Sequence, residues 1–244
     1  MAAASAIANF DYRMTDRRIT RVESSVELGA LSGLSRASAD ALAKAATRLN
    51  FETNELVYTE GEQANGAYIV LRGKVKLVAN SSDGKALILR IARPGEFISL
   101  SAGLSQRTND TSAEALEPTS VAFVSTSSLY RLMESLSDLA LRLAHELSLE
   151  YSLLCQELST LGLQRSAMSR LAKLLVGMTG DQAPQHGSLT STCPLTHEEM
   201  AQMIGTSRET VTRLLHDLRD EGIATIKRET LTINRIEALR AMMN

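Results

Sequence analysis

The segment 195-LTHEEMAQMIGTSRETVTRLLHDLRDEGI-223 constrains the fold of this chain more than any other stretch. It contains two pairs with the spacing of a capping box, a pattern that starts helices: Thr196 with Glu199, and Thr206 with Glu209. Gly205 lies between the pairs, where a helix ends in the left-handed backbone that glycine adopts easily. Two short helices joined by a tight turn with glycine predict a helix-turn-helix.

The second helix of this motif separates polar from apolar side chains. At about 100° per residue, its apolar residues fall within roughly a third of the circle: Val211, Leu214, Leu215 and Leu218. The opposite side carries four candidates for reading DNA bases: Arg208, Glu209, Thr212 and Arg213. Arginine can fork onto the two acceptors of guanine, and glutamate can accept from the amino group of cytosine. A solvated charged face is the alternative, but the helix starts, the glycine turn and the side-chain chemistry together favour base reading.

Residues 223–233 predict two short strands with a polar turn, and residues 235–243 predict a short helix. Lys227 and Arg228 in that turn, or wing, are predicted to contact phosphate. Further phosphate donors are expected near the helix starts: Thr196, His197, Thr206, Ser207 and Thr210. Residues 190–244 hold seven Lys/Arg and eight Asp/Glu, and the whole chain has a formal net charge of -2. We therefore expect affinity to depend on a dimer that reads two half-sites, because a bulk positive charge is absent.

Upstream, the sequence changes character twice. Residues 36–51 predict an amphipathic helix. From 51 to about 125, short apolar runs are separated by glycines, and Asp83-Gly84 between two such runs is a hairpin signal. Closely spaced short strands of this kind favour a small jelly-roll barrel.

Residues 136–164 predict one long helix, since no glycine or proline interrupts them before Gly162. Apolar residues at steps of three and four predict a coiled-coil seam of about three heptads: Ala144, Leu147, Tyr151, Leu154, Leu158 and Leu161. A helix that lies on its own barrel is the alternative. A seam on a helix this long favours a partner helix, so we expect a symmetric homodimer.

The fold class expected from these elements is α+β, in four parts. An N-terminal arm (1–27) precedes a jelly-roll sensor domain (28–134), a dimerisation helix (135–164) and a winged helix-turn-helix domain (165–244).

With these elements in this order, the chain resembles the CRP/FNR transcription regulators, a bacterial family, from about residue 28 to 234. The resemblance is carried by GTSRETVTRLLHDLRDEGI, GEQANGAYIVLRGKVKL, DGKALIL and PGEFI. It implies a homodimeric regulator of double-stranded DNA, with Arg208, Glu209 and Arg213 reading TGTGA-like half-sites of a palindrome. Thr212 stands where the cyclic-AMP receptor protein branch has a glycine. The resemblance leaves RNA polymerase and an unknown small-molecule effector as open candidate partners.

The same resemblance places a cyclic-nucleotide pocket in the barrel, but its polar residues differ. Ser99 and Leu100 replace a Gly-Glu pair that binds ribose, and Thr111 replaces the arginine beside Ser112 that clamps phosphate. Cys155 and Gln156 stand where the dimer helix meets the base, and Arg107 is a nearby cation off the family spacing. The expectation is a regulator that does not respond to cyclic AMP. Two alternatives stay open: a divergent pocket for another small effector, and a redox response through Cys155 or Cys193.

Other classes of function are disfavoured. The two cysteines lie far apart and suit a reducing cytoplasm, and no apolar run approaches the ~20 residues that span a membrane. The barrel region has no histidine for a metal-dependent enzyme, and HEEMA at 197 lacks the second histidine of a zinc-protease motif. We therefore expect no enzyme activity, no metal and no cofactor.

Overall fold

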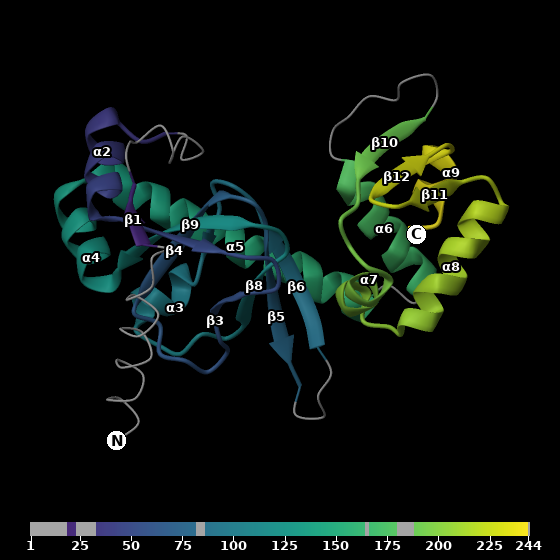
Figure 1. Ribbon diagram of the computed structural model, residues 1–244, viewed down its shortest axis with the longest axis horizontal. Helices are drawn as coiled ribbons and strands as arrows, with labels where there is room; N and C mark the ends of the chain where they lie inside the picture. The colour runs from purple at the N-terminus through teal and green to yellow at the C-terminus, as the bar shows by residue number, and fades with distance from the viewer. Residues whose placement is uncertain (1–18, 23–32, 82–85, 164–165, 180–187, 244) are drawn as a thin grey trace. The chain divides into compact units, whose positions relative to one another are not determined.

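The computed structural model describes residues 19–22, 33–81, 86–163, 166–179 and 188–243, with the side chains of 156–163 left out. The chain forms two compact units, one made of Met1–Lys85 and Leu89–Ser152 and one made of Ala86–Ile88 and Leu153–Asn244 (Figure 1). The long helix α5 (Ser137–Leu163) therefore belongs to both. No described helix is both long enough and apolar enough to cross a membrane.

The N-terminal unit contains two antiparallel sheets in a jelly-roll arrangement (Figure 1), as expected. The five-stranded sheet has the order β1 (Ile19–Arg21), β2 (Thr47–Phe51), β9 (Thr119–Ser125), β4 (Gly66–Arg72) and β7 (Phe97–Ile98). The four-stranded sheet has the order β3 (Leu56–Tyr58), β8 (Ser112–Ala115), β5 (Val75–Asn80) and β6 (Ala86–Ala92).

Strand β4 shows how alternating side chains build two cores. Ala67 and Ile69 belong to the core beneath the helices, whereas Tyr68 and Val70 belong to the core between the sheets. Successive side chains of a strand point to opposite faces, and a strand buried on both faces reads as a continuous apolar run, as AYIVL does.

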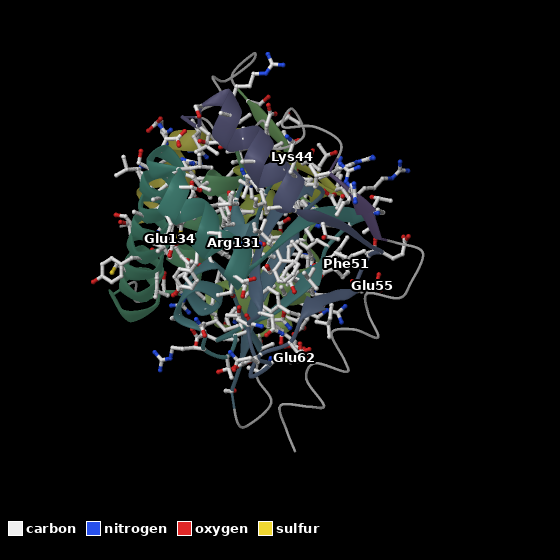
Figure 2. All side chains as sticks on the ribbon, turned by 90° about the vertical axis from the view of Figure 1, so that its left-hand side faces the viewer. Lys44, Phe51, Glu55, Glu62, Arg131 and Glu134 are labelled. Carbon is white, nitrogen blue, oxygen red and sulfur yellow. The ribbon has the colours of Figure 1, made fainter. Side chains whose placement is uncertain are left out.

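Four helices pack on this unit: α2 (Arg36–Ala45), α3 (Leu100–Ser105), α4 (Thr126–Ser135) and the first half of α5. Figure 2 shows the side of α2 and α4, where the labelled Lys44, Arg131 and Glu134 form part of a charged, exposed surface. Gly103 lets α3 lie directly on β4, because a Cβ atom there would be 2.4 Å from the Gly66 carbonyl oxygen.

One sequence prediction in this unit needs correction. The helix expected over 36–51 ends at Ala45, and Thr47–Phe51 instead pairs with β9, because strand pairing outweighs the helical pattern. The arm contributes a strand, since Ile19–Arg21 pairs with β2 and Val22 is buried in the helix-side core. The hairpin expected at Asp83-Gly84 lies outside the described residues.

One face of helix α5 packs on the barrel, and another face is exposed. Leu139 and Leu143 are fully buried, and Leu147 packs partly against the same core. Leu147 thus packs partly on the barrel, because the apolar spacing continues that of Leu139 and Leu143, and its place in the dimer seam stays a prediction. Ala144 and Leu154 are exposed, as are Leu141 (72%) and Tyr151 (69%). Leu158 and Leu161 belong to the helix, but their side chains lie outside the described ones.

The C-terminal unit combines helices with a three-stranded sheet of order β10 (Leu189–Thr192), β12 (Thr230–Ile233) and β11 (Ala224–Lys227). Its helices are α6 (Ala167–Thr179), α7 (His197–Ile204), α8 (Arg208–Asp220) and α9 (Ile236–Ala241). Strands β11 and β12 form the expected wing hairpin, with Lys227 opposite Thr230.

Candidate nucleic-acid interface and effector pocket

Helix α7 begins and ends as the sequence predicts, whereas the start of α8 differs from the prediction. Thr196 and Glu199 form a complete capping box at α7, and Gly205 ends that helix with a φ of 60°. The residue that caps α8, however, is Ser207 and not Thr206, because the Ser207 hydroxyl accepts the N–H of Thr210 at 3.3 Å. The predicted second capping box is therefore wrong by one residue.

Helix α8 presents the predicted polar residues on its outer face. Val211 and Leu218 are fully buried, which fixes the inner face of the helix against the rest of the unit. Arg208, Glu209 and Arg213 are exposed. The helix therefore supplies two guanidinium groups and one carboxylate on one accessible surface, which is hereafter called the reading face together with Thr212.

The local partners of Glu209 favour its ionised form. Its own backbone N–H and the Ser207 hydroxyl lower the pKa of the Glu209 carboxyl, with a smaller contribution from Arg208. An ionised carboxylate is an acceptor only, which suits the amino group of cytosine.

Thr212 differs from the other three residues of the reading face. It is half-buried, and its Oγ1 lies 2.8 Å from Nδ1 of His197, the first residue of α7. The sequence placed both residues in the interface, but it gave no sign that they contact each other.

The predicted phosphate donors fall into two groups. The hydroxyls of Thr196 and Ser207 serve the helix starts, and Ser207 also contacts the Thr210 hydroxyl at 3.1 Å. Lys227 and Arg228 are exposed at the tip of the wing, and Thr206 is half-exposed. The two wing cations are therefore the more accessible of the predicted phosphate donors.

In the barrel, the effector-pocket positions are engaged in contacts within the protein. The Tyr58 hydroxyl has the Thr111 side chain and the Ser99 backbone as hydrogen-bond partners. Burial raises the pKa of Tyr58 to about 12. The Tyr58 ring stacks on Tyr68 with centroids 5.6 Å apart, and Tyr68 in turn contacts Phe123.

Neighbouring predicted pocket residues also form contacts within the protein. Ser99 has a φ of 58° and donates its hydroxyl to Asn109 at 2.6 Å. Ser112 accepts the N–H of Glu60 at 3.0 Å. Leu100 is 1% exposed and lies in the helix-side core, because an apolar side chain at the start of α3 turns into the protein; its place in an effector pocket stays a prediction. Arg107 is exposed.

An ion-pair group that was not predicted from the sequence joins the barrel to α5. Arg90 on β6 donates to Glu96 at 2.8 Å and to the Phe97 carbonyl at 2.7 Å, and it lies 3.8 Å from Glu150 on α5. Burial raises the pKa of Glu150, and Arg90 partly opposes this shift. A signal existed, because Glu150 continues the barrel-facing spacing of Leu143 and Leu147.

The cysteines occupy different environments. Cys155 is exposed on α5, whereas Cys193 is buried and burial raises the pKa of its thiol. The side chain of Gln156, another predicted pocket residue, lies outside the described ones. Within the described part of the chain, no three His, Cys, Asp or Glu residues gather as metal ligands would.

Comparison with known proteins agrees with this architecture. Residues 48–136 match the cyclic nucleotide-binding domain, and residues 169–242 match the Crp-like helix-turn-helix domain. The CRP-like cAMP-activated global transcriptional regulator of Mycobacterium tuberculosis is 26% identical over 212 residues, covering 86% of this chain and 94% of that protein. The global nitrogen regulator of Nostoc is 26% identical over 188 residues, covering 76% and 84%.

Among solved structures, FixK2 from Bradyrhizobium japonicum is similar, with a TM-score of 0.72 and 26% identity over 82% of this chain and 98% of that one. A jelly-roll domain, a long helix and a winged helix-turn-helix define a DNA-binding transcription regulator. The chain belongs to the CRP/FNR family of these regulators.

Proposed function

We propose that this regulator binds, as a homodimer, a palindrome with TGTGA-like half-sites, and that it does so without cyclic AMP. The observation that carries the DNA target is the reading face of α8, where Arg208, Glu209 and Arg213 are exposed together. Arg208 and Arg213 are five residues apart, about 7.5 Å along a helix. That distance corresponds to about two base steps, so the two arginines suit two guanines of one half-site.

The test is an anisotropy titration of the purified protein against a TGTGA palindrome and a scrambled duplex of equal length, at two salt concentrations. We expect at least a thousandfold preference for the palindrome, as is typical of specific sites. Equal affinity for the two duplexes would contradict the target. A palindrome with one half-site scrambled separates a dimer, which loses most of its affinity, from a monomer, which loses little.

The open side of α5 supports the homodimer. Ala144, Tyr151 and Leu154 are exposed there, and Leu141 flanks them. A large apolar surface of this kind marks an interaction site, and the heptad-like spacing suits a second copy of the same helix.

A matched pair of variants tests this surface. Tyr151→Glu is expected to convert the dimer to monomer at micromolar concentration, as measured by sedimentation velocity. Leu149→Glu is the control, because Leu149 is also exposed but lies about 160° around the helix from Tyr151. Loss of the dimer in both variants, or in neither, would contradict this interface.

The proposal of cyclic-AMP independence is supported by the engaged pocket positions. The Tyr58 hydroxyl already has Thr111 and the Ser99 backbone as partners, and Leu100 lies in the core. A buried phosphodiester requires a fixed cation or several N–H donors. Calorimetric titration with cyclic AMP should therefore show no binding, and operator affinity should not change. A saturable gain in operator affinity with cyclic AMP would overturn this part of the proposal and leave the DNA target intact.

A further inference from the structure

The contact between His197 and Thr212 places a constraint on the centre of the reading face. Thr212 is four residues after Arg208 and three after Glu209, so all three lie on neighbouring turns of one helix side. Its hydroxyl is 2.8 Å from Nδ1 of His197, which belongs to a different helix. The bond therefore depends on the packing of α7 against α8.

This bond affects which groups of Thr212, the hydroxyl or the methyl, can contact a DNA base. A free threonine hydroxyl can contact more than one base, since it both donates and accepts hydrogen bonds. Here the hydroxyl is engaged by the imidazole in either tautomer of His197. The β-branched side chain has few χ1 positions in a helix, so a fixed Oγ1 also fixes the methyl group. The bond uses one of the hydroxyl's donor and acceptor sites, and the fixed methyl group is the apolar part of Thr212 that a base edge can contact.

Resting on the proposed function, we propose that His197 is a positioning residue that makes Thr212 a reader of the thymine methyl group. Thymine is the base that presents a C5-methyl in the major groove, and threonine methyls are suited to contact it. Among the described residues, the hydrogen bond found for the His197 ring is the one to Thr212, and the second ring nitrogen, Nε2, suits a phosphate oxygen. One imidazole would then connect the DNA backbone contact to the base contact.

Replacement of thymine by deoxyuridine tests the methyl contact directly, because it removes that methyl group and nothing else. Each thymine position of the palindrome is replaced in both half-sites in turn, and the dissociation constant is measured by anisotropy. For the wild-type protein we expect one position at which affinity falls about fourfold per half-site, the effect of one buried methyl group at about 0.8 kcal/mol. Thr212→Ser lacks the methyl and should show no loss at that position. Thr212→Val keeps a methyl and should retain the loss.

The role of His197 is tested by the same thymine-to-uracil ratio. His197→Ala releases the Thr212 hydroxyl, so the ratio should fall toward one. His197→Asn should restore it, because the asparagine amide can occupy the place of Nδ1. If His197→Ala weakens both duplexes equally and the fourfold ratio persists, His197 is a phosphate contact only and the positioning role is wrong.

The outcomes separate this inference from the proposed function. If the wild-type protein does not distinguish the palindrome from scrambled DNA, the proposed target itself fails. If it does distinguish them, but no thymine position shows a methyl effect that depends on Thr212, this inference alone is wrong. The ratio compares two duplexes with one protein, so a partly unfolded variant does not distort it. Circular dichroism melting of each variant confirms that the bound fraction is folded.

Discussion

The reading face of α8 and the effector-pocket region of the barrel differ in the exposure of their polar side chains. On α8, Arg208 and Arg213 are exposed. In the barrel, the Tyr58 hydroxyl has the Thr111 side chain and the Ser99 backbone as partners, and Leu100 lies in the core. A site can act on a ligand only if its polar groups are available to it. The comparison agrees with the proposal that the protein recognises DNA without cyclic AMP.

The largest effect is expected for Leu100→Glu, which places a carboxylate at the position where the resemblance implies a ribose-binding glutamate. Because Leu100 is 1% exposed within the core, the new charge would be buried without a partner. We expect the free energy of unfolding to fall by about 3 kcal/mol or more in urea denaturation. Leu100→Met keeps the volume and should cost less than about 1.5 kcal/mol. A stable Leu100→Glu protein that binds cyclic AMP would show that the pocket is open after all.

On the DNA side, Arg208→Ala should weaken binding to the palindrome by about 1–3 kcal/mol and relax the preference at one base. The matched control is Lys227→Ala on the exposed wing tip, which should weaken binding to all sequences alike and reduce the salt slope by about one. Anisotropy titrations on the palindrome and scrambled duplex measure both effects. Identical behaviour of the two variants would remove the distinction between base-reading and phosphate-binding residues.

Within the barrel, Tyr58→Phe removes one hydroxyl and keeps the stacked ring. The Thr111 side chain and the Ser99 backbone would lose their shared partner, so we expect a loss of about 1–2 kcal/mol in the free energy of unfolding. Tyr130→Phe is the comparison on the exposed side of α4, where the hydroxyl contacts the Leu104 carbonyl and water can replace it. Equal losses in the two variants would contradict a special role for the buried hydroxyl.

The smallest expected effect is a pH dependence at Glu150. Burial raises the pKa of this carboxyl above 4.5, with Glu146 and Asp110 adding to the shift and Arg90 opposing it. The native state then binds the proton more readily than the unfolded state, so stability falls as pH rises from about 4.5 through the raised pKa. Glu150→Gln should flatten this part of the profile in urea denaturation followed across pH. A profile unchanged by the substitution would contradict the buried position of Glu150.

Much of the fold follows from local patterns. The Thr196–Glu199 box, Gly205 and the apolar face of α8 define the helix-turn-helix, since caps and periodicity act within a few residues. The predicted ends of helices were wrong where tertiary contacts compete with local preference. Thr47–Phe51 became a strand because β9 supplied a partner, and Ser207 became the cap of α8 in place of Thr206.

The sequence by itself determined the family, and it predicted the reading-face residues and the changed pocket positions Leu100 and Thr111. Only the tertiary structure decided what those positions do instead. Tyr58 and Thr111 are 53 residues apart by number, and Arg90 and Glu150 are 60 apart, so no local pattern connects them. His197 and Thr212 meet only because α7 packs on α8. Side-chain partners are fixed by the distances that packing creates, and these distances are set by the whole fold.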